Sequence, residues 1–281
     1  MRFGWNMVIY SIGLAIINNS EKFLLTRLVS VKSLAYYSVA STFANMTTMF
    51  SMAMVQTLIP AFSQLLAPDK KAQLDALFTR SVRISLMGII PSIMFLMIIA
   101  KPFFTIWAGQ EFGNGSIYPY YILLIGIFFS ILVYVPNCIL LASGRSDVFA
   151  KFYVFEVIPY VIVTYLLVRY FGIIGAALAY SLREMVNAFV FIHFARKFAN
   201  VRLQLSDYYL HFTLGFLVFL PAALFAFLYS NFSWWLLLWL PLSLLLYVWV
   251  AWKKMISDEE RIWAGVKIRG MLAKFTRRKD A

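Results

Sequence analysis

Five ionisable side chains stand within or directly beside apolar stretches of this chain. Glu156, Arg183 and Glu184 lie inside such stretches, and Glu21 and Lys22 follow the first of them. A charged side chain costs at least about 2.5 kcal/mol at the centre of a bilayer, so such groups pair with one another or face a cavity. The two cations are suited to attracting an anionic ligand. The three carboxylates are suited to ion pairing or to coupling transport to an ion.

The spacing of these residues leaves two roles open. If each sits on a membrane helix, Glu156 lies about 12 Å from the start of its span and Arg183 about 18 Å from the end of the next, so modest tilt lets them pair. Glu184 points about 100° away from Arg183 around the helix, so the two cannot make the same contact and one needs another partner. An interhelical ion pair that fixes packing and a substrate-facing role both fit. For Glu21 and Lys22 the choice is between a membrane-interface cap and a cavity lining.

No motif for covalent chemistry accompanies these residues. The chain has no Walker loop, no dinucleotide-binding fingerprint and no HExxH sequence. Cys138 is the single cysteine, so neither a disulfide nor a cysteine metal site is expected. His193 and His211 fall near the ends of apolar runs, where interfacial packing accounts for them. The sequence therefore predicts a protein that is not an enzyme and that needs no cofactor and no metal.

The composition indicates that the segments carrying these residues lie in a lipid bilayer. Of 281 residues, 62% are apolar and only 13% are charged, about half the charge of a soluble domain. Apolar runs of about 20 residues predict membrane-spanning helices. We expect an all-α, polytopic transmembrane bundle of about eight spans: 3–19, 34–58, 84–107, 116–142, 148–170, 171–195, 208–230 and 233–252.

The basic residues predict how the bundle is oriented. The formal net charge is +13, but Lys and Arg lie between apolar runs and not on one soluble face, which argues against a nucleic-acid partner. With a cytoplasmic N-terminus, 19 basic residues fall on the cytoplasmic side and 5 on the other. Both termini are therefore expected to be cytoplasmic. The basic tail is expected to touch anionic membrane lipids.

Local patterns predict three further features. The short joint near Gly172 makes spans five and six a helical hairpin. Gly172, Gly175, Ala176 and Ala179 leave one side of span six nearly flat, so another helix can approach closely. The stretch 69–83 has apolar residues at helical spacing and is expected to be a surface helix on the cytoplasmic face.

The order of several short motifs resembles the carboxy-terminal half of polysaccharide flippases, the O-antigen and capsule exporters of the multidrug/oligosaccharidyl-lipid/polysaccharide transporter superfamily. The similar stretches cover about residues 1–200. They are Glu21-Lys22, Ala35-Tyr36-Tyr37-Ser38-Val39-Ala40, Ile59-Pro60-Ala61-Phe62-Ser63, Ile106-Trp107-Ala108-Gly109-Gln110-Glu111-Phe112, Ala142-Ser143-Gly144-Arg145 and Phe171-Gly172-Ile173-Ile174-Gly175-Ala176-Ala177.

The resemblance implies a fold. Family members have two pseudo-symmetric six-helix lobes, some with two further helices, and this chain looks like the second lobe with that extra pair. The expected parts are a six-helix lobe (1–197), two additional helices (198–252) and a basic cytoplasmic tail (253–281). The first lobe has no counterpart here, so the chain is expected to be a truncated reading frame, one piece of a split transporter or a half that dimerises.

The resemblance also implies a function: export of a polyprenyl-diphosphate-linked oligosaccharide across the bacterial inner membrane in cell-surface polysaccharide biosynthesis. Lys22 and Arg183 are then expected to attract the anionic substrate, with Glu21, Glu156 and Glu184 as pairing or coupling residues. Expected partners are the lipid-linked oligosaccharide, membrane lipids, and an amino-terminal lobe or other polysaccharide-assembly proteins. The alternatives are an ion-coupled exporter of small molecules or drugs from the same superfamily and a non-transporting membrane scaffold.

Overall fold

A computed structural model of the chain describes residues 2–201, 213, 217 and 234–254. The chain divides into two compact units, Met1–Tyr208 and Tyr209–Ala281. In the second unit the described helix is α8 (Trp234–Lys254), which corresponds to the expected eighth span. The expected seventh span, 208–230, lies outside the described residues apart from Thr213 and Leu217. The boundaries expected at residues 197 and 252 stay predictions.

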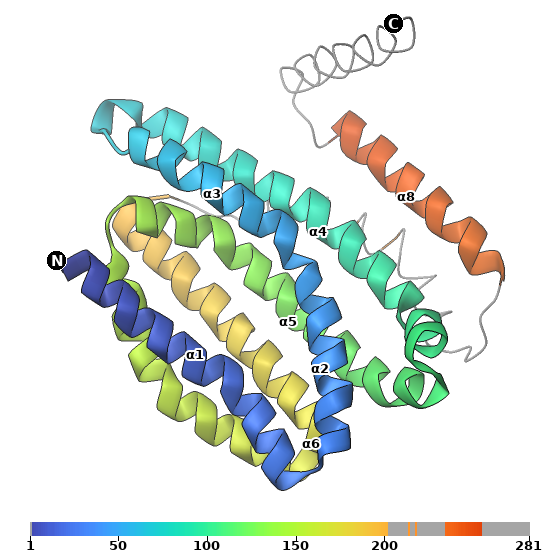
Figure 1. Ribbon diagram of the computed structural model, residues 1–281. Helices are drawn as coiled ribbons and strands as arrows, with labels where there is room; N and C mark the ends of the chain where they lie inside the picture. The colour runs from blue at the N-terminus through green and yellow to red at the C-terminus, as the bar shows by residue number, and fades with distance from the viewer. Residues whose placement is uncertain (1, 202–212, 214–216, 218–233, 255–281) are drawn as a thin grey trace, which may run out of the picture. The chain divides into compact units, whose positions relative to one another are not determined.

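The first unit is an all-helical bundle, and its described part contains no strand (Figure 1). Its helix α5 contacts α2, α3, α4 and α6, whereas α1 contacts α6 and α2. The elements in chain order are α1 (Arg2–Leu28), α2 (Val31–Met46), α3 (Thr48–Gln64), the short 3-10 helix η1 (Pro68–Lys70), α4 (Lys71–Ala108), α5 (Gln110–Ala142) and α6 (Ser146–Ala199).

The helices make six passes through the bundle, because α2 and α3 together form one pass and α6 forms two. The second expected span is interrupted at Thr47, which separates α2 from α3. The fifth and sixth spans form one continuous element, α6, which reverses direction at Gly172. The passes are thus α1, α2 with α3, α4, α5 and the two halves of α6. This arrangement confirms a polytopic helical bundle.

Length and composition separate two groups of helices. Among the described residues, three stretches are long and apolar enough to cross a membrane: Pro68–Ala108, Gln110–Ala142 and Ser146–Ala199. At 54 residues, the last is long enough for a pass on each side of Gly172. Helices α1, α2 and α3 carry more polar residues, and three of these, Asn18, Ser41 and Asn45, line the cavity described below.

The turn at Gly172 depends on two glycines. Gly172 has φ 56° and ψ −130°, a backbone conformation that L side chains rarely adopt. Gly175 packs so closely on the backbone of Leu167 that a Cβ atom there would overlap the Leu167 carbonyl. Ala176 and Ala179 are buried beside it. The expected hairpin and the close helix approach are confirmed.

The stretch 69–83 is helical, as expected, but it is not a separate surface helix, because these residues form η1 and the first turns of α4. Apolar residues recur every fourth position at Leu74, Phe78, Val82 and Leu86, all of them buried, and no glycine or proline separates them from the following span. The Phe78 ring packs against the Phe62 ring of α3, with 6.4 Å between the ring centroids. The stripe therefore packs against protein as part of an α3–α4 hairpin.

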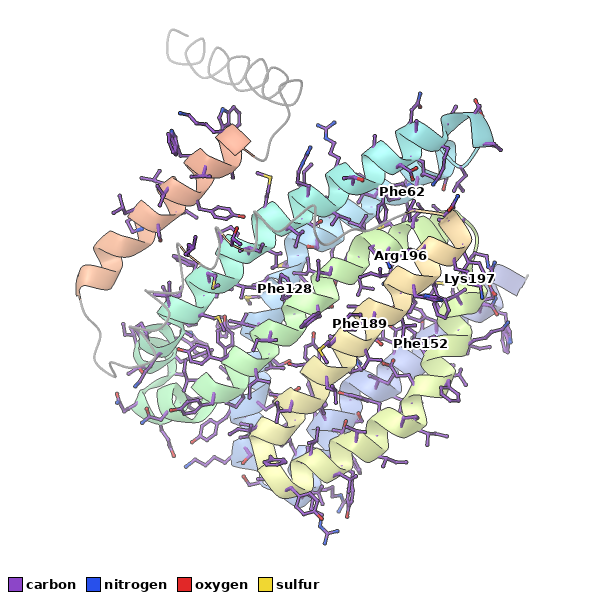
Figure 2. The ribbon with its side chains drawn as sticks, turned by 180° about the vertical axis from the view of Figure 1, so that it is seen from behind. Phe62, Phe128, Phe152, Phe189, Arg196 and Lys197 are labelled. Carbon is purple, nitrogen blue, oxygen red and sulfur yellow. The ribbon has the colours of Figure 1, made fainter. Side chains whose placement is uncertain are left out.

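The opposite ends of the bundle carry different contacts. At one end the Lys32 ammonium of α2 pairs with the Glu111 carboxylate of α5, which raises the pKa of Lys32 and lowers the pKa of Glu111. At the other end the Lys71 ammonium donates to the Asn200 carbonyl at 2.9 Å, just beyond the end of α6. A cation there complements the negative end of the helix dipole. Arg196 and Lys197 add positive charge to the last turn of α6 (Figure 2).

The outer surface of α6 is apolar. Phe155, Ile158 and Phe189 expose 80%, 69% and 64% of their surface, respectively, and Figure 2 shows Phe189 on this helix between its two ends. Exposed large apolar side chains that recur along a helix suit contact with hydrocarbon. The protein is therefore a multi-pass membrane protein.

Candidate functional site: a charged cavity inside the bundle

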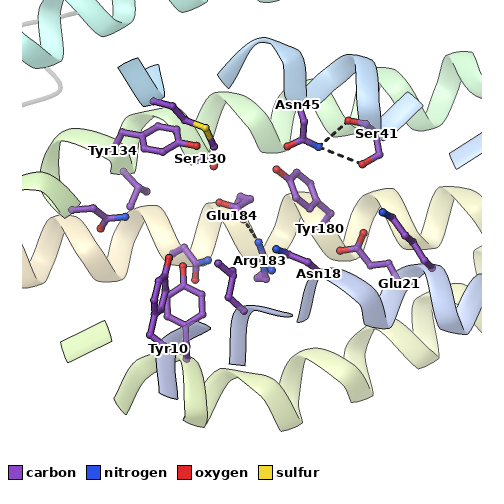
Figure 3. A pocket seen from close by; sticks show the side chains of 17 residues that line it. Tyr10, Asn18, Glu21, Ser41, Asn45, Ser130, Tyr134, Tyr180, Arg183 and Glu184 are labelled. Atoms are coloured by element: carbon purple, nitrogen blue, oxygen red, sulfur yellow. Dashed lines mark hydrogen bonds and ion pairs between the residues drawn. The ribbon is translucent and has the colours of Figure 1, made fainter. Parts of the chain in front are cut away.

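A polar cavity of about 450 Å³ lies inside the first unit, between α1, α2, α3, α5 and α6 (Figure 3). Its wall combines charged, tyrosine and asparagine side chains. Figure 3 shows Tyr10 and Tyr134 towards one side and Glu21 towards the other, with Arg183 and Glu184 between them. The cavity therefore has a charged part and an uncharged aromatic part.

Helical periodicity positions the wall. Along α1 the lining residues Tyr10, Leu14, Asn18 and Glu21 recur every three or four positions and so share one face of the helix. The second half of α6 contributes a matching face, which consists of Tyr180, Arg183, Glu184 and Asn187. Helices α2, α3 and α5 and the first half of α6 complete the wall with Ser41, Asn45, Met52, Ser130, Val133, Tyr134, Asn137 and Tyr153.

Arg183 is the buried cation of this cavity, with 7% of its surface exposed. Its Nη2 atom pairs with the Glu184 carboxylate, and its Cζ atom lies 5.2 Å and 5.6 Å from the ring centroids of Tyr160 and Tyr180. Its Nε and Nη1 atoms are buried and have no hydrogen-bond partner. A guanidinium presents its donors as a planar fork that matches two oxygens of a phosphate or carboxylate. The protein therefore leaves two donors of this fork unpaired.

The Arg183 ion pair differs from the interhelical pair that the spacing allowed. Glu156 could have paired with Arg183, but the ion pair joins the neighbours Arg183 and Glu184. The 100° between adjacent helix positions separates Cα–Cβ directions, and two long side chains that emerge into one cavity can still bend together. Glu156 is half-buried, and its Oε2 atom has no hydrogen-bond partner.

Glu21 is held by tyrosines. It is 95% buried and accepts hydrogen bonds from the hydroxyls of Tyr37 on α2 and Tyr160 on α6. Each carboxylate oxygen thus receives one hydroxyl donor. This arrangement joins three helices at a polar point, and buried polar groups normally need such partners.

Lys22 follows Glu21 but is exposed, and it lines the same cavity. Among the ion pairs of the described residues, none includes Lys22. The structure therefore brings Glu21, Lys22, Arg183 and Glu184 to one cavity, and Glu156 lies outside its lining. Within the described part of the chain, no group of three or more His, Cys, Asp or Glu side chains is arranged to hold a metal ion.

Sequence reasoning missed the tyrosines of the site. Tyr10, Tyr37, Tyr160 and Tyr180 all lie on predicted spans and were not singled out. Two signals were available: Tyr180 lies three residues before Arg183, and Tyr10 lies eleven before Glu21, so each shares a helix face with its charged neighbour.

Comparison with known proteins finds relatives that are described by polysaccharide biosynthesis, O-antigen transport and glycan biosynthesis. A family model described as polysaccharide biosynthesis protein matches residues 1–117. A protein described as an O-antigen transporter from Shigella flexneri is 25% identical over 190 residues, which cover 66% of this chain and 44% of that protein. The low-salt glycan biosynthesis flippase Agl15 from Haloferax volcanii is 28% identical over 174 residues, 61% of this chain and 36% of the relative.

A solved structure agrees in fold. The inward closed conformation of the lipid II flippase MurJ superposes with a TM-score of 0.68 at 14% identity, covering 95% of this chain and 53% of that chain. The resemblance to polysaccharide flippases of the multidrug/oligosaccharidyl-lipid/polysaccharide transporter superfamily is therefore confirmed. The chain spans about half the length, or less, of the relatives it matches.

Proposed function

We propose that this chain forms one lobe of a flippase that moves a polyprenyl-diphosphate-linked oligosaccharide across the bacterial inner membrane, from the cytoplasmic to the outer leaflet. The observation that carries the proposal is the cavity with Arg183, whose Nε and Nη1 atoms are buried without a partner. A buried donor without a partner costs about 1–3 kcal/mol, and a ligand oxygen removes this cost.

The charges of the cavity suit a diphosphate that must bind and leave. Arg183 and Lys22 attract the anion, and attraction is stronger in a membrane cavity than in water because the effective dielectric constant is lower. Glu184 offsets part of the Arg183 charge through their ion pair. A site for a transported ligand needs such moderation, because binding that is too tight prevents release.

The proposal places both chain termini in the cytoplasm, as the distribution of basic residues favours. It also assigns the Lys32–Glu111 end of the bundle to the outer face. The partner is a second lobe that covers the cavity, either from a preceding segment of the same reading frame or from a separate polypeptide. Alternating access between the two lobes then exposes the cavity to each side in turn.

Substitution of the two cations tests the proposal. Lys22→Ala and Arg183→Ala, made in the transporter that contains this chain, are expected to lower export of the polysaccharide by at least tenfold. Arg183→Lys keeps the charge but loses the planar fork, so it is expected to retain part of the activity. Unchanged export in both alanine variants, with normal membrane levels of protein, would contradict the assignment.

The DNA sequence immediately upstream of Met1 tests whether the second lobe is encoded in the same reading frame. An open frame with about six further spans supports a lobe joined to this one. A separate gene directs the search to a partner subunit, which should co-purify with this chain. A chain that purifies alone from cells and still binds no undecaprenyl diphosphate favours the scaffold alternative.

A further inference from the structure

A second cavity of about 290 Å³ adjoins the charged one inside the same unit. The two cavities share four lining residues, which are Tyr10, Met52, Tyr134 and Asn137. None of the residues that line the second cavity carries a formal charge. The charged cavity therefore adjoins an uncharged chamber at a boundary built from α1, α3 and α5.

Asn137 gives this boundary a free hydrogen-bonding group. Its Oδ1 atom is buried and has no partner. Gln56 adds a second side-chain amide to the uncharged chamber. An amide offers two donors and one acceptor, which is the combination that hydroxyl and acetamido groups of a sugar can satisfy. An apolar ligand would leave these groups unpaired at a cost of about 1–3 kcal/mol.

The tyrosines supply flat surfaces beside these amides. Tyr10 is fixed by edge-to-face contacts with Tyr153 at 4.8 Å and Phe149 at 5.9 Å between ring centroids. Tyr134 lies across from it, near Ser130 (Figure 3). Aromatic rings with a polar tip suit ligands that have both apolar C–H faces and hydroxyl groups. Pyranose rings have this character.

The distance between the two regions fits a ligand with two chemically different parts. Tyr10 and Glu21 are eleven residues apart on α1, about 16 Å at 1.5 Å per residue. Arg183 and Glu184 lie between them in Figure 3. A ligand that spans the cavity thus meets charged groups at one end and neutral tyrosine and amide groups at the other.

We infer that Tyr10, Tyr134 and Asn137 form a subsite for an uncharged sugar, next to the diphosphate of the same lipid-linked ligand at Arg183 and Lys22. This inference rests on the proposed function. It gives the ligand a direction, with its sugar towards the second cavity and its diphosphate towards Lys22. It also predicts that the sugar nearest the diphosphate is neutral, because the subsite has no charge to balance an acidic one.

Two lipid probes test the subsite on the full chain in nanodiscs. One is undecaprenyl diphosphate and the other is undecaprenyl-diphosphate-N-acetylglucosamine, which adds one neutral sugar. The quantity to measure is the ratio of the two dissociation constants. We expect the wild-type protein to bind the sugar-bearing lipid more tightly and Asn137→Ala and Tyr134→Ala to reduce this preference about tenfold. Tyr134→Phe keeps the ring and is expected to keep most of the preference.

Two controls separate this subsite from the anion site. Tyr118→Ala changes an exposed tyrosine on the same helix, outside both cavities, and is expected to leave both dissociation constants unchanged. Arg183→Ala is expected to weaken both lipids while preserving their ratio. If Arg183→Ala changes neither constant, the proposed anion site fails, and the ratio still reports on the sugar subsite.

Three results would overturn the inference: equal binding of the two lipids by the wild type, an unchanged preference in both Asn137→Ala and Tyr134→Ala, or equal weakening of both lipids by these variants. Asn137→Asp guards against a folding artefact, because it preserves the shape of the side chain. It is expected to lower the preference because a carboxylate lacks the two amide donors that the sugar would accept from, and an unchanged preference would count against the subsite.

Discussion

The hydroxyl of Tyr160 on α6 donates a hydrogen bond to the carboxylate of Glu21 on α1, across 139 positions of sequence. The Tyr37 hydroxyl of α2 occupies the other oxygen of the same carboxylate. Three helices are thus joined at one buried polar point beside the cavity. Among the described helices, α1 packs mainly on α6 and α2, so these hydrogen bonds lie in both of its interfaces.

Removal of these hydroxyls should loosen α1. Tyr37→Phe and Tyr160→Phe each leave a buried carboxylate oxygen without a donor, which costs about 1–3 kcal/mol. We expect a lower thermal unfolding temperature in detergent for each variant, and a double variant that differs from the sum of the two because both act on one carboxylate. Tyr170→Phe is the control, because Tyr170 lies at an exposed position of α6, the helix that carries Tyr160. A strictly additive double variant would show that the two hydroxyls act independently.

The hairpin inside α6 should not tolerate a side chain at its closest point. Gly175→Val places a branched side chain against the Leu167 backbone, and forced overpacking costs about 1–3 kcal/mol or more. We expect reduced yield of folded protein and earlier unfolding on heating. Gly4→Ala, where a Cβ meets nothing within 4 Å, should have no such effect. Equal yields for both variants would mean that the two halves of α6 pack less closely than described here.

The Lys32–Glu111 pair predicts a charge-swap effect. Lys32→Glu or Glu111→Lys alone places like charges together and should lower the unfolding temperature, and the double swap should restore part of it. Both side chains are more than 60% exposed, so the effect should be small and should fade at high salt. An unfolding temperature that is insensitive to both single swaps would show that the pair contributes nothing.

The same pair sets a pH window. Because the pKa of Glu111 is lowered in the folded protein, its contribution is present above the ordinary glutamate pKa of about 4.3 and is lost as pH falls through the lowered value. Because the pKa of Lys32 is raised, its contribution is present below the ordinary lysine pKa of about 10.4 and is lost as pH rises through the raised value. The difference in unfolding temperature between wild type and Glu111→Gln should therefore be constant between about pH 5 and 10 and should shrink in acid.

The proposed orientation predicts which loops face outwards. In a Cys138→Ser background, Val31→Cys should react with a membrane-impermeant maleimide in intact spheroplasts, and Asp69→Cys should react only after the membrane is opened. Both positions are exposed on the protein and lie at opposite ends of the α2–α3 pass. The reverse pattern would place both termini outside and would invert the proposed direction of the cavity.

The sequence by itself determined that the chain lies in a membrane, where most of its spans fall and that a hairpin forms at Gly172. Runs of about 20 apolar residues leave no other stable structure in a bilayer than helices, because backbone groups must bond within the segment. Glycine and alanine spacing likewise identified the close approach at Gly175. The sequence also identified Glu21, Lys22, Arg183 and Glu184, since ionisable residues in apolar runs are rare enough to be noticed individually.

Only the tertiary structure decided which of these groups meet. Tyr37 and Tyr160 are ordinary residues of apolar runs until the packing of α1, α2 and α6 brings both hydroxyls to Glu21. The partner of Arg183 likewise depended on how two side chains bend inside a shared cavity, which helical periodicity does not specify. The stretch 69–83 could lie on a membrane or pack on protein with the same apolar stripe, and the nearby α3 surface around Phe62 determined the outcome. Sequence periodicity gives the direction of a side chain around its own helix, whereas contacts across helices depend on how the helices pack together.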